Sequence, residues 1–128
     1  DGNQILTASW DNFARLWSTG GKLITIYPHE GALYSARFSP APAGRHILTA
    51  SDDNTARLWS LSGDTLMTLQ HQSPVYFAVF SNDGRQIITA SADNTARLWQ
   101  TPAGIAAWLK TAEVYRLSEA ENQKYEIE

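Results

Sequence analysis

Short runs in which apolar and polar residues alternate recur along the first 100 positions of the chain. In the middle of this region, HILTAS covers residues 46–51 and TARLWS covers residues 55–60. Alternation with a period of two over a run of about six residues predicts a β-strand. Between these two runs, Asp53-Asn54 supplies side chains that tolerate left-handed backbone in a tight turn. The pattern therefore predicts an antiparallel hairpin.

The hairpin is written three times along the chain. TASWDNFARLW begins at Thr7, TASDDNTARLW at Thr49 and TASADNTARLW at Thr89, so the copies start 42 and then 40 residues apart. A histidine, His29 or His71, precedes each of the last two copies, and an apolar run after a glycine follows each of the first two. Self-similarity at such a period is typical of propellers, solenoids and other repeat architectures. Each full repeat is therefore expected to contain four short strands.

The complete pattern predicts ten strands. They span 4–9, 13–18 and 23–27 in the first repeat, 33–38, 46–51, 55–60 and 65–69 in the second, and 75–80, 86–91 and 95–100 in the third. The first repeat thus lacks the strand that would follow its histidine. The third repeat lacks a last strand, because the sequence changes character at Thr101-Pro102.

Four short strands per repeat, with His, Asp and Trp at fixed spacing, resemble the blades of the WD40 (tryptophan–aspartate repeat) β-propeller family over residues 1–100. The resemblance implies an all-β fold: a partial propeller of about three four-stranded antiparallel blades, followed by a short helical C-terminal tail. Residues 1–28 would form a partial blade, 29–70 a complete blade, and 71–100 a blade that lacks its outer strand. Closing blades of such rings commonly take their outer strand from upstream, so the resemblance implies the last blades of a longer propeller. The ending WL…VYRLSEAE…Y-x-I also resembles the closing segment of some bacterial WD-repeat proteins.

The resemblance also implies a buried polar tetrad in each blade, formed by a loop histidine, a strand threonine, a turn aspartate and a tryptophan. An imidazole N–H and a threonine hydroxyl would supply donors to the aspartate, and the indole N–H would complete the network. The positions are Thr7, Asp11 and Trp17 in the first copy, His29, Thr49, Asp53 and Trp59 in the second, and His71, Thr89, Asp93 and Trp99 in the third. The family's Trp-Asp dipeptide is absent, since Ser18, Ser60 and Gln100 follow the tryptophans.

Partners of WD40 propellers usually bind the narrower face, which is formed by the loops before each first strand and by the tips of the central hairpins. Here that face would include Trp10, Glu30, Ala32, Asp52, Gln72, Pro74 and Ala92. Trp10 has no repeated packing role, because Asp52 and Ala92 occupy its place in the other copies. Two roles are open to it: an exposed anchor for a partner, which is a typical role of interface tryptophans, or a cover for a neighbouring blade.

Catalytic and metal-binding chemistry is not expected. Histidine and aspartate recur with a spacing that assigns them to the tetrad, and a group copied in every blade is typical of scaffolding. Residues 51–54, SDDN, lack the ligand ladder and closing glutamate of a calcium loop. Arg15, Arg57 and Arg97 could form a stripe for phosphate, but stacking or ion pairing within the blade is the preferred interpretation. His46 is expected to face solvent.

The composition of the chain argues against several classes of function. The chain has 128 residues, no cysteine and a formal net charge of −3. Without cysteine it has no disulfide framework and no thiol nucleophile, and a mild negative charge argues against nucleic-acid binding. No apolar run approaches the ~20 residues of a membrane span. We expect a cytoplasmic protein that uses no cofactor or metal and does not bind membranes.

Residues 101–128 depart from the repeat. Ile105, Trp108 and Leu109 share one face of a predicted short helix, and residues 118–121, SEAE, form a capping box for a second helix. The preferred interpretation is a tail that packs on the propeller edge, and the alternative is a docking peptide for a partner.

These observations predict a non-catalytic scaffold that mediates protein–protein interaction by binding a protein or peptide. The remaining blades of a parent propeller, or self-association, would complete the ring. One alternative is a regulatory or sensor module of a larger bacterial signalling ATPase or protease, which a P-loop or protease motif upstream of Asp1 would support. Another is a ligand-binding or glycan-binding propeller, which glycan binding through Trp10 would support.

Overall fold

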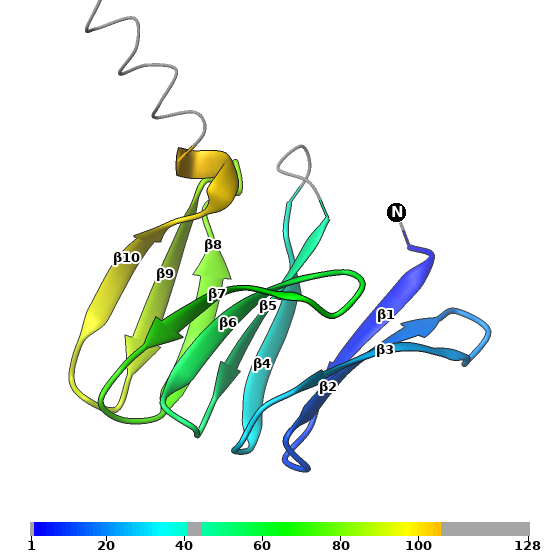
Figure 1. Cartoon of the computed structure of the whole chain (residues 1–128), viewed down its shortest axis with the longest axis horizontal. Coiled ribbons are helices and arrows are strands. Elements are labelled where there is room, and N and C mark those ends of the chain that lie inside the picture. Colours follow the sequence, from blue (N-terminus) through cyan, green and yellow to red (C-terminus); the bar gives the residue numbers. More distant parts are fainter. Residues whose placement is uncertain (1, 41–44, 106–128) are drawn as a thin grey trace, which may run out of the picture.

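The computed structural model describes residues 2–40 and 45–105, and these residues form ten strands in three antiparallel sheets (Figure 1). The first sheet contains β1 (Gln4–Ala8), β2 (Phe13–Ser18) and β3 (Leu23–Pro28). The second contains β4 (Leu33–Phe38), β5 (His46–Ser51), β6 (Thr55–Ser60) and β7 (Thr65–Gln70). The third contains β8 (Val75–Phe80), β9 (Gln86–Ser91) and β10 (Ala96–Gln100). The predicted all-β fold of a partial propeller is confirmed, with three, four and three strands in its sheets.

Strand ends differ from the prediction by single residues. Strands β1 and β10 are each one residue shorter, because the N–H groups of Ser9 and Thr95 bond within the hairpin turns. Strands β3 and β7 are each one residue longer, since Pro28 and Gln70 still pair with the neighbouring strands.

The tight turn of each hairpin depends on an asparagine in the left-handed region. The φ angles of Asn12, Asn54 and Asn94 are 78°, 73° and 67°. Asparagine adopts this conformation more readily than other side-chain-bearing residues. The turn predicted from Asp53-Asn54 is therefore confirmed in all three copies.

The sheets stand in a row and pack face to face (Figure 1). Ile47 and Leu48 are successive residues of β5, so they point to opposite faces of the middle sheet. Ile47 is buried against Leu16 of the first sheet, whereas Leu48 is buried against Ile87 of the third. The middle sheet is therefore covered on both faces, and the core of the molecule lies in two layers, one on each side of it.

The outer faces of the first and third sheets are open. Leu48 and Leu58 have no exposed surface in the middle sheet, but their equivalents in the third sheet, Ile88 and Leu98, are 47% and 61% exposed. On the opposite face, Ile47 is fully buried and its equivalent in the first sheet, Ile5, is 49% exposed. The same repeated residues are buried or exposed according to whether a neighbouring sheet is present among the described residues.

The chain leaves the repeat through a helical turn at residues 102–105. Thr101 caps this turn: its Oγ1 accepts a hydrogen bond from Gly104 N at 3.0 Å and donates to Gly84 O at 2.8 Å. Pro102 occupies the first helical position, where its missing N–H costs nothing. Trp108, Leu109 and the predicted capping box at 118–121 lie outside the described residues. No helix in the described part of the chain has the length and apolar character needed to span a membrane.

Candidate functional site

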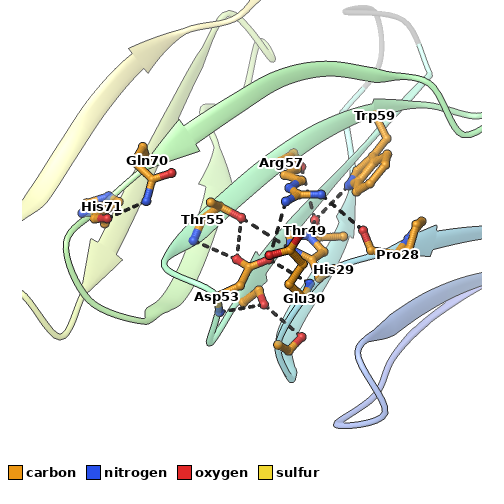
Figure 2. Close-up of polar contacts among 12 residues, drawn as sticks. Pro28, His29, Glu30, Thr49, Asp53, Thr55, Arg57, Trp59, Gln70 and His71 are labelled. Atoms are coloured by element: carbon orange, nitrogen blue, oxygen red, sulfur yellow. Dashed lines mark hydrogen bonds and ion pairs between the residues drawn. The ribbon is translucent and has the colours of Figure 1, made fainter.

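The polar residues predicted from the repeat meet inside the middle sheet (Figure 2). Nε1 of Trp59 donates to Oγ1 of Thr49 at 2.9 Å. The Thr49 hydroxyl lies 2.6 Å from Nε2 of His29, whose Nδ1 lies 2.8 Å from Oδ2 of Asp53. His29 and Thr49 are buried, and the Asp53 side chain is only 7% exposed. One continuous chain of contacts therefore joins the tryptophan to the turn aspartate.

Asp53 is the acceptor at the end of this chain. Burial alone would raise the pKa of Asp53, but the hydrogen bonds from His29 and Thr55 outweigh it and hold that pKa well below the usual range of a carboxyl group. An ionised carboxylate only accepts hydrogen bonds, so His29 donates from Nδ1. In the neutral ring, Nε2 is then an acceptor for the proton of Thr49, so the contacts from Trp59 through Thr49 and His29 run toward Asp53. The Thr49 hydroxyl also lies 3.4 Å from Arg57 O.

Two further residues complete the network, and the sequence analysis missed them. The threonine that bonds to Asp53 is Thr55, through both its N–H and its hydroxyl, whereas Thr49 bonds to His29. The expectation that the strand threonine itself satisfies Asp53 is therefore wrong. Oγ of Ser51 accepts from Asp53 N at 3.1 Å and donates to Gly31 O at 3.0 Å, which fixes the turn against the preceding loop. Both positions recur in the third copy, as Ser91 and Thr95, and this recurrence was the available signal.

The third sheet repeats the arrangement. Trp99 Nε1 donates to Thr89 Oγ1 at 2.8 Å, and His71 lies 2.6 Å from Thr89 Oγ1 and 3.0 Å from Asp93 Oδ2. The Thr95 hydroxyl, with N–H groups and His71, outweighs burial and holds the pKa of Asp93 well below its usual range. Two independent copies of the same geometry indicate that the network belongs to the framework of the sheet.

The first sheet carries a reduced form of the network. Trp17 Nε1 donates to Thr7 Oγ1 at 2.9 Å, but the described residues contain no histidine for Asp11. Asp11 instead forms an ion pair of 2.7 Å with Arg15, and its side chain is 48% exposed. The hydrogen bond and charge of Arg15 lower the pKa of Asp11. Phe13 stands where the other copies have threonine, so no side-chain hydroxyl from this position satisfies the carboxylate.

The repeated arginines pair within their own sheets. The distances from Nη2 to the turn carboxylate are 2.7 Å for Arg15, 3.7 Å for Arg57 and 3.7 Å for Arg97. Arg57 also lies over the ring of Trp59, with its guanidinium carbon 5.8 Å from the ring centre. The expected pairing within the blade is confirmed, and these side chains do not form a free phosphate stripe.

His46 is half-buried, so the expectation that it faces solvent is wrong in part. Its backbone N–H donates to Ser39 Oγ at 2.9 Å, and the residue pairs with Ser60, so it lies at the start of β5 opposite the end of β6. Among the residues that the structure describes, no group of three or more His, Cys, Asp or Glu side chains is placed to hold a metal ion.

The loops of the predicted partner face lie together at one end of the sheets. Asp52 N donates to Ala32 O at 2.8 Å, and Ala92 N donates to Pro74 O at 2.9 Å. Trp10, at the tip of the first hairpin, is 79% exposed and therefore does not cover a neighbouring sheet in the described part of the molecule. Glu30, Gln72 and Ala92 are exposed, and Ala32 and Pro74 are half-buried.

Two tyrosines add to this end, and the sequence analysis did not single them out. Tyr34 and Tyr76 are partly exposed, and the hydroxyl of Tyr34 donates to Asp52 Oδ1 at 2.8 Å. This hydrogen bond, with partial burial and the charge of Asp52, raises the pKa of Tyr34. Tyrosine recurs at the same position of two repeats, one residue after Leu33 and Val75, and this recurrence could have identified the pair from the sequence.

A groove of about 470 Å³ opens at the opposite end of the inner strands, between the first, second and third sheets. Leu6, Phe38 and Phe80 line it, and Arg37 is the only ionisable side chain among the described residues of its lining. Such a lining offers no acid–base pair for catalysis.

The fold and its repeated networks define a class of repeat protein, and comparison with family models identifies it. The model described as WD domain, G-beta repeat (WD40) matches residues 1–18, 20–60 and 63–100. The chain therefore belongs to the WD40 repeat family. The central match contains β3 to β6, so the repeat in sequence is offset by one strand from the sheet in space. A comparison with curated proteins finds no match to the sequence.

Proposed function

We propose that the chain is a non-catalytic WD40 scaffold that binds a protein or peptide at the end of the sheets where the hairpin tips lie. The observation that carries the proposal is the exposure of Trp10 on the first of these tips. A tryptophan with this much exposed surface offers a large apolar area and an indole N–H to another molecule. WD40 repeats generally serve protein interaction, which supports the same conclusion.

The titratable groups of the sheets support binding over catalysis. The His29 and His71 side chains have no exposed surface, and their ring nitrogens are both occupied by hydrogen bonds. A general acid or base must be within hydrogen-bond reach of a substrate. These imidazoles are committed to the framework, so the proposal assigns them no role in a reaction.

The proposal also covers the wider architecture. Residues 1–28 form a partial blade, 29–70 a complete blade and 71–100 a blade that lacks its outer strand. The packing of the tail, residues 101–128, on the propeller edge is an expectation that falls mostly on residues 106–128, which lie outside the described part of the chain. Further WD-type blades, from the remainder of a parent propeller or from a second copy of this chain, cover the open faces at Ile5 and Leu98. The setting is cytoplasmic, the partner is not a nucleic acid or a membrane, and no cofactor takes part.

A photo-crosslinking residue at Ala92 tests the proposal. Ala92 lies on the same end as Trp10, but it belongs to the third sheet. We expect a crosslinked protein from position 92 in cells of the source organism, and we expect Trp10→Ala to abolish it. The matched control is the same residue at Ser62, on the turn between β6 and β7, where no crosslink to that protein is expected. Equal crosslinking from both positions, or crosslinking at 92 that is unaffected by Trp10→Ala, would contradict the proposal.

A further inference from the structure

Tyr34 and Tyr76 form an aromatic pair across two neighbouring sheets. Their ring centres are 5.1 Å apart and their planes are inclined by 64°. Each tyrosine sits at a break in strand register, between Leu33 and Ser35 in one sheet and between Val75 and Phe77 in the other. A bulge of this kind redirects a side chain relative to the regular alternation. The repeat thus presents two rings side by side at the end of the molecule that carries the hairpin tips.

A carboxylate borders the pair. Asp52 is exposed, and one of its oxygens accepts the hydrogen bond from the Tyr34 hydroxyl at 2.8 Å. Among the described residues Asp52 has no ion-pair partner, and neither does Glu30 nearby in the same loop cluster. By contrast, Arg15, Arg57 and Arg97 are all paired with turn aspartates. The uncompensated charge at this end of the molecule is therefore negative.

We propose that Tyr34, Tyr76 and Asp52 form a subsite for one cationic side chain, arginine or lysine, in an extended segment of a partner protein. This inference rests on the proposed function and names the chemistry that the partner must present. A cation over an aromatic face gains from the ring quadrupole, and a carboxylate beside the ring adds a charge-assisted hydrogen bond. The hydrogen bond from Tyr34 orients Asp52 before the partner arrives, which lowers the cost of ordering the site.

The position of Trp10 fits an extended partner. Leu33 N donates to Ser9 O at 3.1 Å, so the tip of the first hairpin is joined to the strand that carries Tyr34. Trp10 follows Ser9 directly, and Tyr34 follows Leu33 directly. A partner whose cation lies on the tyrosine pair can therefore place a neighbouring apolar side chain on Trp10. An acidic segment would be repelled by Asp52 and Glu30.

Titration of the full chain with small probes tests the subsite. The probes are N-acetyl-arginine amide and N-acetyl-lysine amide, with N-acetyl-glutamine amide and N-acetyl-glutamate amide as uncharged and anionic counterparts. Amide chemical shifts in ¹⁵N-labelled protein locate the binding. We expect the two cationic probes to shift Tyr34, Asp52 and Tyr76, with the other two probes inactive over the same range. The comparison of arginine with lysine shows which cation the subsite prefers.

One variant removes the carboxylate and the other removes one aromatic ring. Asp52→Ala copies Ala92 of the third hairpin, and Tyr76→Leu removes one ring. Each is expected to weaken the cationic probes about five-fold, the size of one cation–π or ion-pair contribution. Asp64→Ala, an exposed carboxylate in the turn between β6 and β7, is the charge-matched control and should leave the affinity unchanged. Dispersed amide spectra show that each variant is folded.

Equal binding of the glutamine probe, or an Asp52→Ala variant that binds arginine as well as the native chain, would overturn the subsite. The crosslink from position 92 is independent of this result. If the probes fail but the crosslink is still formed and still depends on Trp10, the proposed scaffold function is retained and only the proposed recognition of a cation is wrong. If position 92 gives no crosslink in the native chain while the probes still bind at Tyr34 and Tyr76, the proposed protein partner is wrong and the cationic subsite is retained.

Discussion

Nε2 of His29 lies 2.6 Å from Oγ1 of Thr49, although the two residues come from different parts of the repeat. His29 belongs to the loop that leaves the first sheet, and Thr49 lies in the middle of β5. The contact therefore ties the connection between two sheets to the interior of the second. Both groups are buried. Without Thr49, Nε2 of His29 would lose its hydrogen-bond partner, whereas without His29 the Thr49 hydroxyl would keep its contacts with Trp59 Nε1 and Arg57 O. The network accordingly fixes how successive sheets are joined.

Trp59→Ala is expected to lower the free energy of unfolding by ~3–5 kcal/mol, as a large-to-small change in a packed core. Trp59 is 3% exposed and packs against Tyr27 with ring centres 5.6 Å apart, so little can fill the space. Urea denaturation followed by circular dichroism measures the change. Leu66→Ala, at a partly exposed site on β7, is the control and should stay within ~0.5 kcal/mol. A loss below ~1 kcal/mol for Trp59→Ala would show that this tryptophan is not part of the core.

Asp53→Ala is expected to cost on the order of 1–3 kcal/mol, since His29 and Thr55 lose their buried acceptor. The matched variant is Asp11→Ala, at the same position of the first sheet, where the aspartate is half exposed and paired with Arg15. Screening by solvent makes that pair weaker. Asp53→Ala should therefore destabilise the chain more than Asp11→Ala in the same denaturation experiment. Equal losses would mean that the histidine network adds nothing to the turn.

Acid should weaken the fold through the same aspartates. The folded pKa of Asp53 lies below its value in the unfolded chain, ~3.9. The unfolded state then binds more protons at low pH, so the stabilisation is complete above about pH 4 and is lost as the pH falls below it. Unfolding free energies measured between neutral and acidic pH should decrease in the native chain and change less in Asp53→Asn. An identical pH dependence in both would contradict the assignment.

The open sheet faces predict self-association of the isolated chain. Ile88 and Leu98 present the same apolar pattern that the middle sheet buries completely, and strand edges β1 and β10 each have a partner on one side only. Sedimentation should show concentration-dependent association, which Leu98→Glu reduces. Leu66→Glu, on a sheet edge away from the open faces, should change it less. A stable monomer with protected amides throughout β1 and β10 would show that these faces need no partner.

The sequence predicted the fold because each strand and turn is set by local chemistry. The alternation in HILTAS, the left-handed preference of Asn54 and the spacing of His29, Thr49 and Trp59 are all visible in one repeat. Residues that recur in a second copy could then be assigned to the framework of the blade, and residues that do not recur could be considered for binding. Ten strands and their order followed from this information alone.

Other features depend on what lies next to a residue, and the sequence does not contain that information. Leu48 and Ile88 occupy the same position of the repeat, yet only Leu48 has a neighbouring sheet to cover it. Tyr34 and Tyr76 meet because register breaks in two sheets turn both rings toward the same end. The bond of Thr55 to Asp53, in place of Thr49, follows from side-chain directions within the turn. Each of these requires the three-dimensional arrangement.

The most direct test concerns Trp10, which is assigned to the binding end of the propeller and not to the framework that contains Trp59. The measurement is the crosslinking yield from position 92 in Trp10→Ala, read together with its unfolding free energy. We predict that the crosslink is lost while stability stays within ~0.5 kcal/mol of the native chain, as expected for an exposed surface site. An undiminished crosslink in a folded Trp10→Ala variant would contradict the claim that this end of the propeller binds the partner.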